Sequence, residues 1–375
     1  MHTFICRSNN CNKKAKYICG ECKIAVYCSK ICHNTTWEER HREEHEIGFI
    51  NAPVAFEQNI ENWEKFWQEH EIGSLKVLGR GTYGIVFRVK AVDGKKYALK
   101  VYLNDKDYDN IAYETTIQKY ISNKCESALK YYGTGKIDFI PQLKNIFSKI
   151  FQTSYHEMDK ILVSKIEFIE GKNLVDYGHV NLALTFLKIA IPLLDQLACF
   201  HDNGLLHNDI KPENIMITGN WPIIRRAVLI DYGLSCSEKN TEDTKSFKCD
   251  EYSVGPSQNY VPPEVFSERV KNNSKGGFLS KPSDVWSLAI TFVAMTLEDD
   301  IRDWVFPSPH PDDEIDFINN DWKWNEEVTK YQDKDKKLKK EITKIVLKMI
   351  EKDPNNRLSA KDALQKFKTL ERTRK

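Results

Sequence analysis

The sequence of 375 residues has almost no net charge, because 55 Lys and Arg are balanced by 54 Asp and Glu. A chain without a charge excess has no general attraction to nucleic acid or to anionic lipid. It also lacks a long apolar run: the longest, near residues 182–194, is interrupted by Lys188 and Pro192 and is too short to cross a bilayer. These two absences argue against a nucleic-acid-binding protein and against a membrane-embedded one.

The first ten residues, MHTFICRSNN, lack the charged and then apolar layout of a secretory signal. We therefore expect a cytoplasmic or nuclear protein, in which thiols stay reduced and clustered cysteines favour metal over disulfides. Beyond residue 32 cysteine is scarce, and the four that occur there lack the spacing of metal ligands. We expect these four to be ordinary packing or surface residues: Cys125, Cys199, Cys236 and Cys249.

Six cysteines and two histidines are present in the first 45 residues, in four pairs with the spacing of metal ligands. Four pairs are enough for two tetrahedral zinc sites. So short a segment cannot bury a large core, and metal binding would supply folding energy. A single zinc ion with spare cysteines and a set of three disulfides are the alternatives. The pairs are Cys6 and Cys11, Cys19 and Cys22, Cys28 and Cys32, and His41 and His45.

The run YCSKIC, followed by Trp37 and His41, resembles a MYND zinc finger. In that family the first and third ligand pairs share one zinc ion, and the second and fourth share the other. Two features depart from the family: four residues separate the first pair, and His45 stands where Cys is usual. The resemblance implies a module at residues 1–48 that binds proline-containing peptides, with nucleic acid a less favoured partner. It assigns Cys6, Cys11, Cys28 and Cys32 to one zinc ion and Cys19, Cys22, His41 and His45 to the second.

Residues 49–72 form the predicted linker. In it Phe66 and Trp67 follow Trp63 by three and four residues, as they would on one face of a short helix. We expect these aromatics to pack between the two modules or onto the second one.

The stretch LGRGTYGIVFRVK contains Gly79, Gly81 and Gly84 in the pattern G-x-G-x-x-G. Rossmann folds share this pattern, but in them a helix follows directly. Here the residues after the glycines alternate as in a strand, and the DGK turn at 93–95 predicts a hairpin into a strand that holds Lys100. Because glycine lets backbone N–H groups approach phosphates, the stretch predicts a phosphate-binding hairpin.

The octapeptide HNDIKPEN, residues 207–214, is predicted to be a loop, since Pro212 stops an ordinary helix or central strand. The sequence Asp-Tyr-Gly follows it, and its Asp231 lies 22 residues beyond Asp209. In their order along the chain, the glycine-rich hairpin, its lysine and these two loops resemble eukaryotic-type protein kinases, from about residue 75 to the C-terminus. The resemblance implies an α+β, bilobal fold.

The kinase resemblance predicts a domain over residues 73–370, with a β-rich N-lobe at 73–168 and a helical C-lobe at 169–370. It implies transfer of the γ-phosphate of ATP to serine or threonine of protein substrates. Asp209 would orient the hydroxyl and accept its proton, and Lys211 would contact the γ-phosphate. Asn214 and Asp231 would hold Mg²⁺, which prefers oxygen ligands.

The resemblance also assigns the nucleotide site. Lys100 would hold the α- and β-phosphates and pair with Glu114, and Ile166 would lie beside the adenine pocket. Backbone groups near 167–169 would bond the adenine edge. Residues 141–158 look like an insertion of unknown use. The residues predicted to bind ATP are Leu78, Gly79, Arg80, Gly81, Thr82, Tyr83, Gly84, Val86, Ala98, Lys100, Glu167, Ile169 and Met216.

Further residues match the kinase scaffold. Asp284 resembles the buried helix residue that braces the catalytic loop, and Arg357 would pair with Glu264. His207 would pack beneath Tyr232.

Asn208 is a departure from the family, since most regulated kinases carry Arg there to pair with a phosphorylated activation loop. Because Asn is neutral, we expect activity that does not depend on that phosphorylation. Two alternatives are a pseudokinase scaffold that binds partners through both modules, and a kinase-fold enzyme for small molecules or lipids. The lysine and both aspartates that a pseudokinase usually loses are present.

Overall fold

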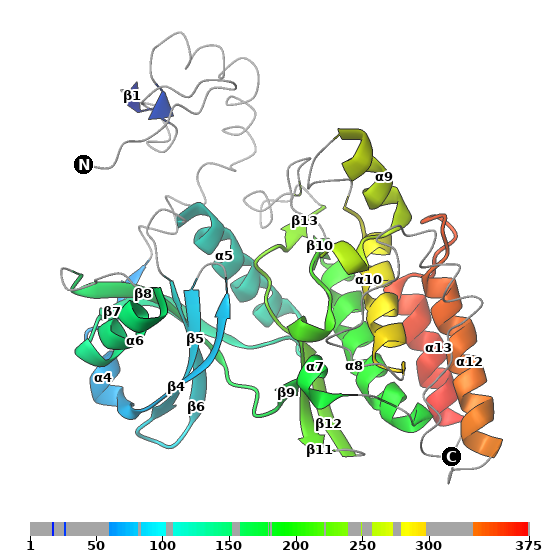
Figure 1. Cartoon of the computed structure of the whole chain (residues 1–375), viewed down its shortest axis with the longest axis horizontal. Coiled ribbons are helices and arrows are strands. Elements are labelled where there is room, and N and C mark those ends of the chain that lie inside the picture. The colour runs from blue at the N-terminus through cyan, green and yellow to red at the C-terminus, as the bar shows by residue number, and fades with distance from the viewer. Residues whose placement is uncertain are drawn as a thin grey trace. The chain divides into compact units, whose positions relative to one another are not determined.

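The fold is taken from a computed structural model (Figure 1). The chain divides into two compact units: Met1–Thr116, Gly133–Lys165 and Lys239–Lys248 make up unit 1, and Ile117–Tyr132, Ile166–Glu238 and Cys249–Lys375 make up unit 2. The structure describes residues 17–18, 26–27, 60–81, 84–102, 108–151, 158–178, 180, 182–220, 223–238, 249, 257–272, 279–297 and 333–373.

Near the N-terminus, the structure describes one small antiparallel pair, β1 (Tyr17–Ile18) and β2 (Val26–Tyr27), in which Tyr17 lies opposite Tyr27. All eight predicted zinc ligands lie outside the described residues, as do Thr82 and Tyr83 of the glycine-rich stretch.

Unit 1 is built on a mixed six-stranded sheet with the strand order β3-β7-β8-β6-β5-β4 (Figure 1). The β4–β5 and β5–β6 pairs are antiparallel, as the predicted hairpin requires, and β3 runs parallel to β7. The sheet and the helices beside it are β3 (Glu61–Asn62), α4 (Phe66–Glu69), β4 (His70–Gly81), β5 (Gly84–Ala91), β6 (Lys96–Tyr102), α5 (Tyr108–Lys124), β7 (Tyr131–Asp138), α6 (Pro141–Phe151) and β8 (Lys160–Glu167). The second half of α5, the first two residues of β7 and the last two of β8 belong to unit 2.

Alternation along β5 and β6 decides which side chains enter the core of unit 1. Ile85, Phe87 and Val89 are fully buried together with Leu99 and Val101, because every second side chain of a strand points to the same face. Lys100 lies between two of these positions and therefore points to the opposite face.

The linker aromatics pack onto this same core. Phe66 is 3% exposed within it, and Trp63 and Trp67 pack against it. The indole N–H of Trp67 also donates to the backbone carbonyl of Asp138 at 2.9 Å. The prediction that these aromatics pack onto the second module is confirmed, because they form part of the core of unit 1.

The predicted insertion contains helix α6, which adds Leu143 and Phe147 to the core. The ring of Phe147 lies 6.1 Å from that of Phe87. At the end of α6, the guanidinium of Arg80 lies 4.5 Å from the centre of the Phe151 ring. The insertion therefore covers the face of the sheet that carries the core and reaches the glycine-rich hairpin.

Unit 2 is mainly helical, with a three-stranded sheet of order β12-β11-β9 and the short pair β10–β13 (Figure 1). Its core is formed by α8 and α10 with α12 and α13 packed against them. Its elements are β9 (Lys172–Asn173), α7 (Leu174–Tyr177), α8 (Ala183–Asp202), β10 (Leu205–Leu206), β11 (Ile215–Asn220), β12 (Ile223–Leu229), β13 (Cys236–Ser237), α9 (Pro263–Asn272), α10 (Lys281–Ala294), α12 (Asp333–Met349) and α13 (Ala360–Arg372).

Helix α8 runs through Pro192 and is, within the described part of the chain, the one helix long and apolar enough to cross a membrane by length and composition. The fold buries 67% of its most apolar window, as expected for the central helix of a folded domain. This length and apolarity therefore agree with a core role.

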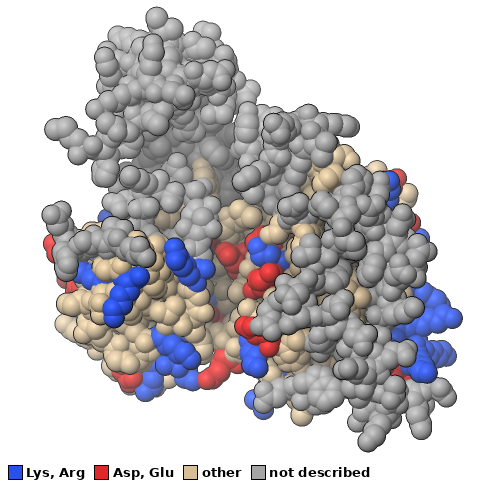
Figure 2. All heavy atoms as spheres, viewed as in Figure 1, with Lys and Arg blue, Asp and Glu red and all other residues tan. Residues whose placement is uncertain are grey.

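Helix α12 carries a strongly basic face. The sequence DKDKKLKKEITKIVLKM places lysines along its outer side, and Figure 2 shows Lys and Arg gathered over the position of α12. The apolar residues Leu338, Ile342 and Val346 recur every four residues and enter the core of unit 2. The helix is thus amphipathic, with charge on the exposed side.

The four cysteines beyond residue 32 correct one prediction. We expected ordinary packing or surface residues, but they form two disulfides, Cys125–Cys199 and Cys236–Cys249, with Cα–Cα distances of 6.0 and 4.9 Å. Both distances lie in the range that a disulfide requires. The partners are 74 and 13 residues apart in sequence, so only the folded chain brings them together.

Candidate active site

In unit 1 the central feature is an ion pair. The ammonium of Lys100 on β6 lies 2.5 Å from the carboxylate of Glu114 on α5. Their side chains are 14% and 9% exposed, so solvent screens this pair less than a surface pair. The predicted Lys–Glu pair is therefore present, and it fixes the position of a lysine ammonium on the face of β6 opposite the core.

Two glycines of the glycine-rich hairpin have different surroundings. A Cβ on Gly84 would lie 2.0 Å from the carbonyl oxygen of Val101, so this residue must be glycine for β5 to pair with β6. Around Gly79 nothing lies within 4 Å, and Leu78 is 44% exposed. The backbone at Gly79 is therefore open to approach, as phosphate binding requires.

In unit 2 the side chain of Asp209 is held on both carboxylate oxygens. Oδ1 accepts the hydroxyl of Ser257 at 2.9 Å, and Oδ2 accepts the amide of Asn214 at 2.8 Å. The ammonium of Lys211 lies 2.9 Å from Oδ2 and donates to Ser257 Oγ at 2.9 Å. Asp209 is 8% exposed, so one nearly buried carboxylate is fixed by three residues.

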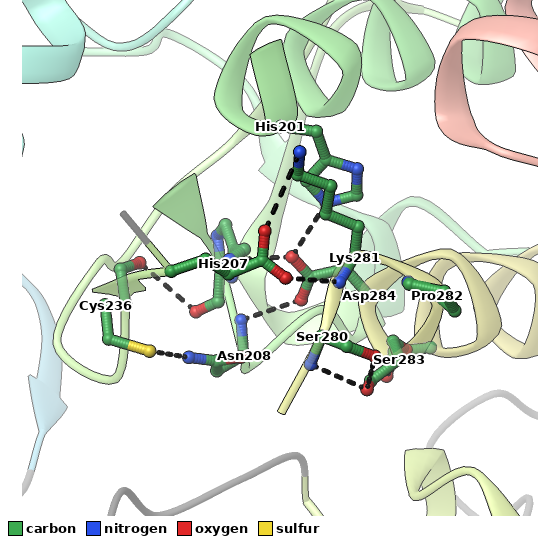
Figure 3. Close-up of polar contacts among 12 residues, drawn as sticks. His201, His207, Asn208, Cys236, Ser280, Lys281, Pro282, Ser283 and Asp284 are labelled. Carbon is green, nitrogen blue, oxygen red and sulfur yellow. Dashed lines mark hydrogen bonds and ion pairs between the residues drawn. The ribbon is translucent and has the colours of Figure 1, made fainter. Parts of the chain in front are cut away.

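Asp284 of α10 braces the backbone of this loop (Figure 3). Its carboxylate accepts the backbone N–H groups of His207 and Asn208, both at 2.8 Å, and lies 3.1 Å from Nε2 of His201. The carboxylate is almost fully buried, and α10 begins with a capping box formed by Ser280 and Ser283. The predicted brace is therefore confirmed.

The protein kinase domain family matches residues 72–367, which is well over half of the chain. The chain belongs to the protein kinase family. The ordered set of a glycine-rich hairpin, a Lys–Glu pair and a braced Asp loop is what this family uses for phosphoryl transfer.

Curated relatives of this kinase are similar over part of their length. The "membrane-associated tyrosine- and threonine-specific cdc2-inhibitory kinase wee-1.3" of Caenorhabditis briggsae is 29% identical over 230 residues, 60% of this chain and 29% of its own length. The "serine/threonine-protein kinase cds1" of Schizosaccharomyces pombe is 28% identical over 257 residues, 67% of this chain and 50% of its own. The "MAP kinase kinase MKK1/SSP32" of Saccharomyces cerevisiae is 28% identical over 249 residues, 65% of this chain and 42% of its own. The kinase chain thus spans at most about half the length of these relatives.

Other predicted scaffold contacts of the kinase are also present. Arg357 binds Glu264 through two parallel hydrogen bonds of 2.8 and 3.0 Å, and the side chain of the arginine is fully buried. The ring of His207 lies 5.6 Å from that of Tyr232 at an interplanar angle of 90°. Both contacts hold segments of unit 2 around the catalytic loop.

Burial shifts the titration of these two aromatic groups. It lowers the pKa of His207, against the opposing effect of Asp284, Asp209 and Asp231. Burial also raises the pKa of the Tyr232 phenol. Nδ1 of His207 accepts the backbone N–H of Asp209 at 3.3 Å, a contact that agrees with the lowered pKa of the ring.

Two residues of the kinase loops have a left-handed backbone, Asn208 and Asp231, each with φ of 63°. Such φ values are uncommon outside glycine, although Asn and Asp tolerate them best. This conformation is held in part by Asp284 at residue 208 and by a weak bond of 3.4 Å from the N–H of Gly233 at Asp231. The surrounding contacts therefore impose an unusual backbone at two functional positions.

The residues predicted to contact adenine belong to both units. The N–H of Glu167 donates to the carbonyl of Lys130 at 2.8 Å, and its carboxylate binds Arg226 and the N–H of Lys130. Glu167 is therefore a structural anchor whose carbonyl alone is suited to the adenine edge. Ile169 and Met216 lie in unit 2, while Val86 and Ala98 lie in unit 1.

The predicted Mg²⁺ ligands, Asn214 and Asp231, fit a cation that needs few protein ligands. The amide nitrogen of Asn214 donates to the carbonyl of Asp209 at 2.9 Å as well as to its carboxylate, which leaves Oδ1 as the end suited to a cation. Mg²⁺ usually takes one or two protein oxygens and completes its shell with water and phosphate. Among the residues that the structure describes, no group of three or more His, Cys, Asp or Glu could hold a metal ion.

Sequence reasoning missed Ser257. Its hydroxyl bridges Asp209 and Lys211, but it lies 46 residues beyond Lys211. No local pattern around it signals a function, and only the folded chain places it beside Asp209.

Proposed function

We propose that this kinase transfers the γ-phosphate of ATP to serine or threonine hydroxyls of proteins. The observation that carries the proposal is the fixed carboxylate of Asp209, which has Lys211, Asn214 and Ser257 around it. A carboxylate held in this way can orient a substrate hydroxyl and accept its proton, which is what phosphoryl transfer needs from a protein side chain.

The other roles follow from charge. Lys211 would contact the γ-phosphate beside Asp209, and Lys100 would hold the α- and β-phosphates, since both are fixed ammonium groups. Asn214 and Asp231 would hold Mg²⁺, which neutralises phosphate charge when it is bound.

Two points support serine and threonine as acceptors. Lys211 is the residue that resembles the Ser/Thr class of protein kinases, and one relative is named a serine/threonine-protein kinase. The Caenorhabditis relative is named tyrosine- and threonine-specific, so a peptide library that contains all three hydroxyl residues is the suitable substrate.

The test is phosphate transfer from ATP and Mg²⁺ to this library by the full chain and by Asp209→Asn. We expect the variant to lose about 10²- to 10⁴-fold in rate, because an amide cannot accept the proton. Asp202→Asn is the matched control, since Asp202 is exposed at the end of α8 and should retain full activity.

A wild-type rate as low as that of Asp209→Asn would overturn the proposal. That result would favour the alternative of a scaffold that binds partners without phosphate transfer. Transfer to a lipid or small molecule, but to no peptide in the library, would favour the third class of enzyme.

We also propose that residues 1–48 form a MYND-type module that holds two zinc ions and recruits a proline-containing peptide. The support is the spacing of its eight Cys and His ligands. Metal analysis of the purified chain should give two zinc ions, and Cys19→Ser with Cys22→Ser should remove one of them. A chain without zinc would refute the module, and a single ion would support the one-site alternative.

A further inference from the structure

Strand β10 follows helix α8. Strand β13, which begins the activation segment that follows Asp231, pairs with it. In β13, Cys236 pairs with Leu206 and Ser237 with Leu205 of β10, just before the catalytic loop. The hydroxyl of Ser237 and the N–H of Glu238 both bond the carbonyl of Gly204, at 3.2 and 2.8 Å. The start of the segment is therefore fixed to the strand that leads into the catalytic loop.

The chain returns to the same place at Cys249. The N–H of Cys249 donates to the carbonyl of Ser237 at 2.8 Å, and its sulfur is bonded to that of Cys236. The disulfide closes a loop between residues 13 apart in sequence. Closing a loop removes conformations that an open segment could otherwise adopt.

Asn208 connects this cross-link to the catalytic loop. Its amide nitrogen donates to Sγ of Cys236 and to the carbonyl of Leu234, both at 3.0 Å (Figure 3). Asn208 is 1% exposed, and its neighbour in sequence is Asp209. A neutral amide at this position cannot attract a phosphate, but it can hold the sulfur of a cross-linked segment.

The returning segment also supplies Ser257, eight residues after Cys249. Its hydroxyl bonds Asp209 and Lys211, so the position of the segment affects the catalytic carboxylate itself. Cys249 and the hydroxyl that contacts the Asp209 carboxylate are therefore only eight residues apart in sequence.

We propose that Cys236 and Cys249 form a redox modification site that takes a low-molecular-weight disulfide as oxidant and, in the oxidised form, fixes Cys249 beside β13 and Asn208 and so supports kinase activity. The proposal rests on the proposed kinase function. In this kinase the cross-link together with Asn208 takes the place of the pairing between a charged residue and a phosphorylated loop.

Oxidation occurs in two exchange steps. Cys249 is the less buried sulfur, so its thiolate attacks oxidised glutathione first, forms a mixed disulfide and releases one glutathione thiolate. The thiolate of Cys236 then attacks the sulfur of Cys249 in the mixed disulfide and releases the second glutathione. Two protein thiols lose two electrons and two protons, and one glutathione disulfide becomes two glutathione thiols.

The second disulfide gives a matched control. Cys125–Cys199 joins the end of α5 to α8, where its sulfurs contact Lys124 and Asn203, whereas Cys236 bonds Asn208 of the catalytic loop directly. Cys199→Ser removes a cross-link elsewhere in unit 2. Cys249→Ser removes the segment cross-link and keeps the Cys236 sulfur that Asn208 contacts. Both variants retain the N-terminal cysteines, so any effect of oxidant on those residues is the same in each.

The experiment equilibrates the full zinc-loaded chain and both variants with reduced or oxidised glutathione. Phosphate transfer to the peptide library and the cross-linked peptides, identified by mass spectrometry without reduction, are measured on the same samples. We expect activity of the wild type and of Cys199→Ser to fall at least about threefold on reduction, in step with loss of the Cys236–Cys249 peptide. Cys249→Ser should stay at the reduced level under both conditions.

Three results would overturn the site: no Cys236–Cys249 peptide in the oxidised wild type, a cross-link that forms without a change in activity, or a Cys249→Ser variant that responds like the wild type. The first readout does not depend on folding of any variant. An oxidised wild type that carries the cross-link but transfers no phosphate would instead overturn the proposed kinase function, so the two failures are distinguishable.

Discussion

Lys100 of unit 1 and the Asp209 loop of unit 2 are held in place by different kinds of contact. In unit 1, the ammonium of Lys100 forms an ion pair with Glu114 and lies over the ring of Tyr102, and a Cβ on Gly79 of the nearby hairpin would meet nothing within 4 Å. In unit 2, the catalytic loop is fixed by two backbone bonds to Asp284, and Asp209 is held by three side chains. The Lys100 ammonium is thus positioned by a carboxylate and a ring, and the Asp209 loop by a network of backbone and side-chain hydrogen bonds.

This difference follows from what each half must do. A phosphate-binding hairpin has to admit a large charged substrate and leave its backbone accessible. The catalytic carboxylate has to keep one position to within a fraction of an ångström, which requires several surrounding contacts. Damage to the network should therefore appear first as lost stability, and damage to the Lys100–Glu114 pair as lost activity.

Asp284→Ala should give the largest change in stability. It leaves the buried N–H groups of His207 and Asn208 without an acceptor, which we expect to cost about 3–5 kcal/mol in the free energy of unfolding of unit 2. Urea denaturation followed by circular dichroism measures it. Asp202→Ala, at an exposed position, is the control and should change stability by less than about 0.5 kcal/mol. An equal, small loss in both variants would mean that the network does not hold the loop.

Glu114→Gln should give a smaller change, and it should appear in activity. The amide keeps the shape of the side chain but removes the charge that holds Lys100, so we expect kcat/KM for ATP to fall about 10- to 100-fold. Glu71→Gln is the matched control, because Glu71 pairs with Lys90 at 3.0 Å on the same sheet with both side chains about 42% exposed. A Lys100→Met, Glu114→Gln double variant should lose no more than Lys100→Met alone, whereas losses that multiply would show that the two residues act separately.

The smallest effect should come from pH. Burial lowers the pKa of His207 below its ordinary 6.5, so the unfolded chain binds a proton that the folded chain rejects. This contribution to stability is complete above about pH 6.5 and is lost as the pH falls towards the folded pKa. Thermal unfolding between about pH 7.5 and about pH 5.5 should show a falling midpoint, and the fall should be smaller in His207→Gln.

His70→Gln provides the comparison with unit 1, since burial also lowers the pKa of His70, against a hydrogen bond from its Nδ1 to the carbonyl of Phe66 at 2.8 Å. Each variant should reduce the pH dependence of the unfolding midpoint only for the unit that contains the substituted histidine. A fall in midpoint that is identical in the wild type and in His207→Gln would contradict a lowered pKa for the buried His207.

Much of the candidate site could be read from sequence because its residues lie in short motifs with a fixed local geometry. The alternation of β5 and β6 placed Lys100 opposite the core, and Pro212 ended any helix or strand at the catalytic loop. Pairings over long distances, such as Arg357 with Glu264, were predictable only through the family resemblance, since no local periodicity connects residues 93 apart.

The residues that escaped prediction have no local signal. Ser257 contacts Asp209 only in the folded chain, and the role of helix α6 follows from Phe147 packing against Phe87 on the core face of the sheet. The four cysteines beyond residue 32 are the clearest example, because their spacing in sequence gave no sign that they would form two disulfides.

By itself, the sequence determined the order of motifs and the residue types available for phosphoryl transfer, because strand alternation and turn chemistry are local properties of a chain. The fold class came from its resemblance to protein kinases. Tertiary structure alone decided that Asn208 holds Cys236, that Cys249 returns to join it and that Ser257 reaches Asp209. Contacts between residues far apart in sequence depend on how helices and strands pack, and packing is a property of the whole fold.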